Sequence, residues 1–155
     1  MLFRSVNLID KNVIVIPTKT VPQGITAITV FNCEAPASEN EDAMNEAILK
    51  VQTGSITYAI RDTQLDDTNI VKGDILGLIE GRIIKTGSSI FEVCDDVITK
   101  MLNDNSELLT LFYGEDCDAL KIKDFVKTLE EKYPNIDIQC YDGKQPLYYF
   151  IISVE

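Results

Sequence analysis

The first candidate contact residues are Thr18, Lys19 and Thr20, which join an apolar run to a helix signal. The run, residues 13–16, is wholly β-branched and predicts a strand, and Pro22 suits the first turn of a helix. Where a strand feeds a helix, two hydroxyls, a cation and free helix N–H groups could bind an anion. The alternative is that Thr20 only caps the helix and Lys19 is a solvated charge, because phosphate cradles use a glycine-rich loop.

Two other places carry candidate contact residues. Arg61 and Asp62 end an alternating segment, residues 55–62, that predicts a strand. Their ion pair could face a partner, or it could be a local salt bridge. Lys144 and Gln145 lie in a tight connection between the last two predicted strands, where we expect Gly143 to supply a positive φ. Together with the elbow, defined as residues 18–23, the candidate binding residues are Thr18, Lys19, Thr20, Gln23, Arg61, Lys144 and Gln145.

Several reaction classes lack their usual residues in this chain. Histidine is absent, and the four cysteines contain no CxxC pair. Zinc sites and Ser-His or Cys-His catalysis are therefore not expected. Glu115 and Asp116 follow a buried strand, but no third or fourth ligand stands at a useful spacing, so we interpret them as loop and helix-start acids. No catalytic residue and no metal ligand is predicted.

The charge of the chain limits its partners. With 25 acidic and 14 basic residues its net charge is −11, so a phosphate backbone would repel it and nucleic-acid binding is not expected. The acids are dispersed, which favours a solvated acidic face, while complementarity to a basic protein partner is the alternative. No apolar run approaches membrane-spanning length, and no signal peptide is recognised, so we expect no membrane insertion and a cytoplasmic location.

The pattern of elements predicts an α/β fold with a mixed sheet, flanking helices and a β-hairpin. An amphipathic helix is expected over residues 39–52, with Gly54 as its C-cap, and Ser89 with Glu92 forms a capping box before a helix with an apolar stripe. Strands are expected over residues 13–16, 55–62, 69–71, 74–79, 82–85, 107–113, 136–141 and 147–154. We expect one domain over residues 11–155, preceded by a residual or artefactual segment, residues 1–10.

Several segments, in order, resemble one family. They are KNVIVIPTKTVPQGI (residues 11–25), AMNEAI (43–48), VQTGSITYAIRDT (51–63), VKGDILG (71–77), YGED (113–116) and GKQPLYYFIISVE (143–155). Together they resemble the C-terminal region of the large, ATP-binding subunit of bacterial fatty-acid kinase, a dihydroxyacetone-kinase-like protein. The family's C-terminal region is similar to the DegV fold of the fatty-acid-binding partner subunit.

The resemblance implies a partner-docking or structural domain of a kinase that phosphorylates carrier-bound fatty acids. Its expected partners are the kinase domain of the same chain and the DegV-type fatty-acid-binding subunit. No cofactor is expected in this fragment, while ATP and magnesium are expected in the complete protein. DegV-type carriers use a histidine before their last strand, and residues 141–146 have none, which disfavours independent fatty-acid binding. The alternative is a stand-alone small-molecule or lipid-binding DegV-like module, which requires a closed apolar pocket of a few hundred Å³.

Overall fold

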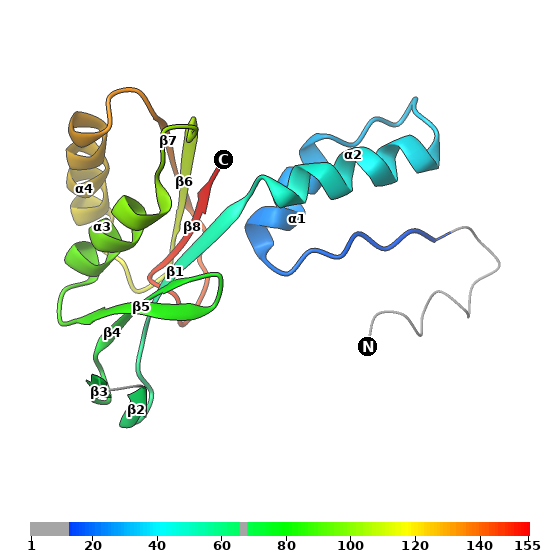
Figure 1. Ribbon diagram of the computed structural model, residues 1–155. Coiled ribbons are helices and arrows are strands. Elements are labelled where there is room, and N and C mark those ends of the chain that lie inside the picture. The colour runs from blue at the N-terminus through cyan, green and yellow to red at the C-terminus, as the bar shows by residue number, and fades with distance from the viewer. Residues whose placement is uncertain (1–12, 66–67) are drawn as a thin grey trace. The chain divides into compact units, whose positions relative to one another are not determined.

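The computed structural model describes residues 13–65 and 68–155 (Figure 1). The chain divides into two compact units, Met1–Val51 and Gln52–Glu155. The expectation of a single domain over residues 11–155 stays a prediction, and the segment of residues 1–10 lies outside the described residues.

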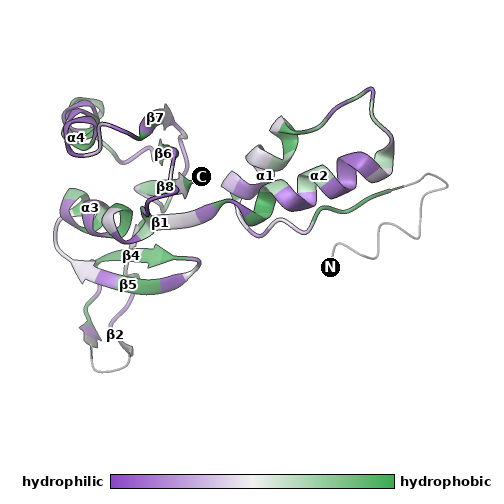
Figure 2. Cartoon of the chain, turned by 45° about the horizontal axis from the view of Figure 1, so that its top comes forward, coloured by the Kyte–Doolittle hydropathy of each residue, from purple (hydrophilic) through white to green (hydrophobic). Residues whose placement is uncertain are grey.

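The first unit contains helices α1 (Val21–Thr29) and α2 (Ala37–Leu49). The buried side chain of Asn40 organises the loop between them: its Oδ1 accepts from the Asn32 N–H at 2.7 Å, and its Nδ2 donates to the Asn32 carbonyl at 2.8 Å. Figure 2 shows that α2 is largely hydrophilic, in keeping with its single buried face. The loop is thus fixed by one amide that satisfies backbone groups of both polarities.

The predicted strand at residues 13–16 is wrong for this structure, because these residues form no ladder with any described strand. A strand needs a neighbour to satisfy its backbone groups, and β-branched side chains favour strands mainly through packing on a pleated surface. Ile14 and Ile16 instead line an apolar hollow of about 250 Å³ together with Phe31 and Met44.

The second unit is built on a six-stranded mixed sheet, which confirms the predicted fold class. The strand order is β5-β4-β1-β8-β6-β7, with β6 and β7 parallel and the other neighbours antiparallel. A separate antiparallel hairpin, β2 with β3, interrupts the connection from β1 to β4. The strands are β1 (Gln52–Tyr58), β2 (Thr63–Leu65), β3 (Thr68–Ile70), β4 (Ile75–Ile79), β5 (Arg82–Gly87), β6 (Leu108–Tyr113), β7 (Asp137–Asp142) and β8 (Phe150–Val154).

Helices α3 (Ile90–Met101) and α4 (Ala119–Lys132) lie on the same side of this sheet (Figure 1). The Ser89 side chain accepts from the Glu92 N–H at 3.4 Å, so the predicted helix start is confirmed. The predicted apolar stripe of α3 is also confirmed, because its five inner members are buried: Val93, Cys94, Val97, Ile98 and Met101. The ring centroids of Phe91 and Phe125 lie 5.1 Å apart, and this contact joins α3 to α4.

Gly54 is not a helix cap, contrary to the sequence expectation. Helix α2 ends at Leu49, and Gly54 lies within β1. A Cβ at Gly54 would come within 2.6 Å of the Met101 sulfur and 3.1 Å of a Val97 methyl. The glycine therefore serves the close approach of α3 to the sheet, a role that depends on tertiary packing.

Candidate functional site

The elbow forms the N-terminus of α1 in the first unit. The Thr20 hydroxyl accepts from the Gln23 N–H at 3.4 Å, and the Gln23 side-chain oxygen accepts from the Lys19 N–H at 2.8 Å. This reciprocal arrangement resembles a capping box and confirms Thr20 as the N-cap. Two backbone N–H groups that an anion could use are thus already bonded, which weakens the anion interpretation. The side chains of Thr18 and Lys19 are exposed.

The other predicted residues lie at one edge of the second unit's sheet. Strand β8 is antiparallel to both β1 and β6, and β7 is parallel to β6, so β1, β6 and β7 run in the same direction. Their carboxyl ends therefore share an edge, here called the carboxyl edge. Arg61 follows β1 there, and Lys144 and Gln145 follow β7. In open α/β sheets this is the usual place for contacts with ligands.

The corner, residues 143–149, is held against the end of β6 by hydrogen bonds. The Gln145 side-chain nitrogen donates to the Phe112 carbonyl at 2.8 Å, and the Gln145 carbonyl accepts from the Glu115 N–H at 3.2 Å. The Gly114 N–H donates to the Tyr149 carbonyl at 3.0 Å. Gln145 is therefore occupied in fixing the corner, whereas the Lys144 side chain is exposed.

The expected positive φ at Gly143 is wrong. Lys144 and Leu147 take the left-handed conformation instead, with φ of 51° and 70°. A side chain at Gly143 would collide with the Gln145 amide and come within 3.2 Å of the Phe112 side chain. A side chain here would displace the Gln145 amide, which donates to the Phe112 carbonyl, and would crowd the Phe112 side chain.

Arg61 lies in the neck, defined as residues 59–62 and 71–74, from which the β2–β3 hairpin extends. The Ala59 N–H donates to the Asp74 carbonyl at 2.9 Å, and the Asp62 carboxylate accepts from the Lys72 N–H at 2.7 Å. Asp62 is thus engaged with backbone, and no ion pair of Arg61 is found among the described residues. Ile60 remains 72% exposed although it is large and apolar.

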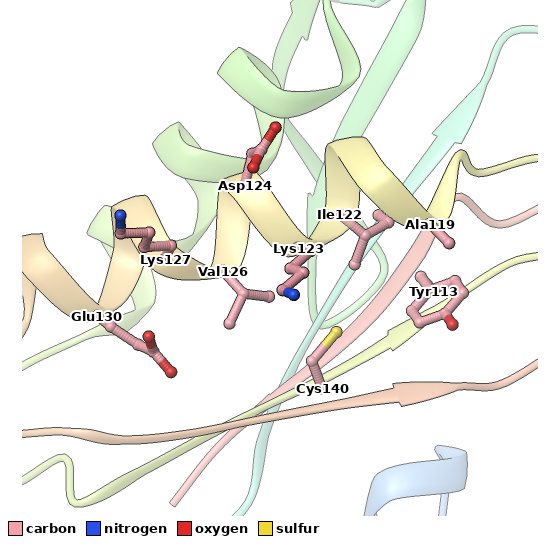
Figure 3. Close-up of a pocket in the computed structure, with 9 residues that line it drawn as sticks. All are labelled: Tyr113, Ala119, Ile122, Lys123, Asp124, Val126, Lys127, Glu130 and Cys140. Atoms are coloured by element: carbon pink, nitrogen blue, oxygen red, sulfur yellow. The ribbon is translucent and has the colours of Figure 1, made fainter.

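An open groove of about 580 Å³ lies between α4 and the strands β6 and β7 (Figure 3). Ile122, Val126, Cys140 and the ring of Tyr113 supply its apolar surface. Its polar residues come from α4, and with Ala119 they complete the lining: Lys123, Asp124, Lys127 and Glu130.

The floor of the groove is uncharged at neutral pH. Burial raises the pKa of the Cys140 thiol to about 11. Burial and the nearby Asp142 carboxylate raise the pKa of Tyr113. Lys123 has no ion pair among the described residues, and Lys127 lies 4.0 Å from Glu131 in an exposed pair of small energetic value.

Our sequence reasoning missed the groove. One sequence pattern could have indicated the groove: an apolar residue followed by lysine occurs twice, as Ile122-Lys123 and Val126-Lys127, four residues apart on one helix face. The remainder of the lining depends on the pairing of β6 with β7, which local sequence patterns do not predict.

A family model that describes the C-terminal region of FakA-like fatty acid kinase proteins matches residues 4–155. The chain belongs to this family. Protein YloV of Bacillus subtilis strain 168 is 38% identical over 152 residues, which are 98% of this chain and 28% of that protein. An uncharacterized protein of Staphylococcus aureus strain MRSA252 is 35% identical over the same shares. The chain thus spans 28% of the length of these curated relatives.

Family membership confirms the resemblance at the level of the FakA-like C-terminal region of fatty acid kinase. The likeness of that region to DegV proteins stays a prediction. Within the described residues no helix is long and apolar enough to cross a membrane. In the same ranges no three side chains of histidine, cysteine, aspartate or glutamate gather where they could hold a metal ion.

Proposed function

We propose that the chain is a partner-docking region of a fatty-acid kinase, whose complete form uses ATP to phosphorylate a fatty acid held by a DegV-type carrier. The observation that carries this proposal is the family match over residues 4–155. The relatives are much longer than the matched part, which leaves room in them for catalytic domains. On this view the chain contributes binding surface, and it has no turnover of its own.

We propose that the nucleotide and the magnesium ion of the complete kinase bind outside this chain. Magnesium bound with phosphates is held by one or two carboxylates and the phosphate oxygens, and within the described residues no three histidine, cysteine, aspartate or glutamate side chains gather to form a metal site of the protein's own. The elbow lacks a glycine-rich turn, and its helix N-terminus is capped by its own side chains. We therefore assign no step through ATP or magnesium to this chain and place both in the remainder of the complete protein.

The neck is the surface we propose for docking the carrier. Ile60 and Val71 are 72% and 56% exposed, and Arg61 and Lys72 stand beside them. Arginine is enriched among the residues that dominate binding energy at interfaces, and exposed apolar side chains beside it add surface that a partner can bury. The backbone hydrogen bonds of the neck hold these residues in place, so binding would cost little ordering. Lys144 lies at the same edge of the sheet and could extend the contact.

The test measures the affinity of the complete protein for the DegV-type carrier of the same organism by calorimetry. We expect Arg61→Glu and Ile60→Asp each to weaken binding about tenfold or more, because they place a charge in the contact. The matched control is Arg82→Glu, an exposed arginine on β5. Equal affinity of the Arg61 and Arg82 variants would remove the neck from the interface. Full affinity of a protein lacking residues 13–155 would overturn the docking function.

The groove beside α4 supports the second candidate function, a small-molecule or lipid-binding module. Its volume of about 580 Å³ and its apolar floor suit a ligand, and its lysines suit an anionic group. Against it, the groove is open, whereas this hypothesis required a closed pocket. Native mass spectrometry of the purified protein tests it: a bound acyl chain that is lost in Val126→Glu would favour this function, and an empty protein would contradict it.

A further inference from the structure

Helix α1 is apolar on two opposite sides. Its inner side carries the buried Pro22 and Ala27. Its other side carries Val21, Ile25 and Ile28, which are 63%, 42% and 71% exposed. The spacing of four and then three residues places these three side chains in one stripe, here called the outer face.

The outer face has the properties of a surface that is normally buried. A surface helix of a globular protein carries polar residues on its solvent side, whereas α1 contains no charged residue in its nine positions. Gly24 lies beside the stripe, and no atom comes within 4 Å of the position its Cβ would take. A neighbouring element could therefore approach the backbone of α1 closely. Phe31, just beyond the helix, is 56% exposed and enlarges the apolar surface.

A lipid surface does not suit this helix. Helices that lie in a membrane interface combine an apolar face with lysine and arginine on the polar face. Helix α1 has neither charge, and a chain with a net charge of −11 is repelled by anionic headgroups. We therefore expect a protein surface, and not a lipid surface, to cover the outer face.

The run of residues 13–16 points to the same occupant. These four β-branched residues are separated from the elbow only by Pro17 and pair with no described strand; Val13 is exposed and the other three are partly buried. A strand that feeds a helix normally belongs to a sheet on which that helix packs. A missing sheet would therefore satisfy both the backbone of the run and the outer face of α1.

The comparisons indicate where that sheet could come from. The matching model describes a C-terminal region, and the chain spans 28% of relatives that it matches along 98% of its own length. The extra length of the relatives thus belongs largely before this region. We propose that polypeptide preceding this region in the complete protein supplies a sheet, that residues 13–16 join it as a strand, and that the outer face of α1 packs on it.

Cysteine labelling of the complete gene product tests the proposal. In a Cys33→Ser background, Ile28→Cys reports the outer face, and Asp42→Cys on exposed α2 is the matched control in the same unit. We expect maleimide to label position 28 about tenfold or more slowly than position 42, because a packed surface must open first. In the 155-residue chain by itself, position 28 should label as fast as position 42. Equal labelling at both positions in the complete protein would overturn the proposal.

Two further measurements separate the alternative occupants. Protection of position 28 that disappears on dilution, together with a change in mass by light scattering, would assign the outer face to a second copy and overturn the proposal. Hydrogen exchange of the backbone amides of residues 13–16 tests the strand: slow exchange in the complete protein supports it, and fast exchange contradicts it. Neither measurement depends on the carrier, so the neck can fail as a docking surface while this interface stands.

Discussion

At the scale of single residues, Gly114 carries the tightest backbone contact of the carboxyl edge. A Cβ at this position would collide with the Tyr148 carbonyl and lie 2.8 Å from the Gln145 carbonyl. Both obstacles are backbone atoms of the corner, so they cannot rotate away. We expect Gly114→Ala to lower the free energy of unfolding of the second unit by about 1–3 kcal/mol.

Urea unfolding followed by tyrosine fluorescence measures this effect, because all six tyrosines lie in the second unit. Gly24→Ala is the control: its Cβ would meet nothing within 4 Å, and it lies in the first unit. It should leave the tyrosine-detected transition unchanged. An unaltered transition in Gly114→Ala would show that the corner moves aside freely.

The cysteines differ in burial, and this makes their chemistry predictable. Cys33 is exposed, whereas burial raises the pKa of Cys94, Cys117 and Cys140. Since the thiolate is the reactive form, we expect one fast-reacting thiol in the native protein at pH 8 and four after denaturation. Ellman's reagent counts them. A fast reaction at Cys140 in native Cys33→Ser protein would contradict the burial described here.

The raised pKa of Cys140 also has a consequence for stability. Its pKa rises from about 9 to about 11 on folding, so between these values the unfolded chain releases a proton that the folded chain keeps. The free energy of unfolding therefore falls as pH rises through this window, and the contribution is complete below about pH 9. Urea unfolding at pH 8 and pH 10 should show a smaller loss in Cys140→Ala than in the unmodified chain. Equal losses would assign the pH dependence to other groups.

At the scale of elements, the start of α3 depends on one hydroxyl. Ser89 accepts from the Glu92 N–H, and α3 contributes five buried side chains to the core. We expect Ser89→Ala to cost about 1 kcal/mol of stability, the usual loss for a helix N-cap. Ser88→Ala is the matched control, because Ser88 is exposed and no hydrogen bond of its side chain is found in the described structure. Thermal unfolding followed by circular dichroism compares the two, and equal melting temperatures would contradict the cap.

Elements with a strong local signal were predicted well from the sequence. The capping box and the 3.6-residue apolar period of α3 are complete within 13 residues, so no distant contact was needed to recognise them. The run at residues 13–16 has an equally clear pattern, yet a strand exists only with a partner. Gly54 was misassigned because it faces Val97 and Met101, which are far away in the sequence. At Gly143 the turn was located correctly, but the positive φ falls on the next residue, Lys144.

At the scale of the whole molecule, the candidate site was predicted only in part. The sequence located the corner and Arg61, and the topology then placed both at the carboxyl edge. The exposed Ile60 and the groove beside α4 became visible only once burial and strand pairing were known. The elbow shows the opposite case, because the side chains of Thr20 and Gln23 cap their own helix, while those of Thr18 and Lys19 are exposed.

The second unit has a core of its own, which leads to a prediction about truncation. All the residues of its hydrophobic cluster lie between Ile56 and Val154. We expect residues 52–155 to fold without the first unit, with a melting temperature within a few degrees of that of the tyrosine-detected transition in the whole chain. Circular dichroism and calorimetry of the truncated protein measure this. A broad, non-cooperative transition would show that the first unit is required.

The position of β8 in the sheet has a consequence for synthesis. Phe150–Val154 lies between β1 and β6, so the centre of the sheet is the last of its strands to leave the ribosome. Until then β5-β4-β1 and β6-β7 are two separate parts of the sheet, and the edge strands β1 and β6 both lack β8 as a hydrogen-bonding partner. The sheet can therefore be completed only after residues 150–154 have emerged, which prolongs the time in which chaperones can bind the unfinished unit.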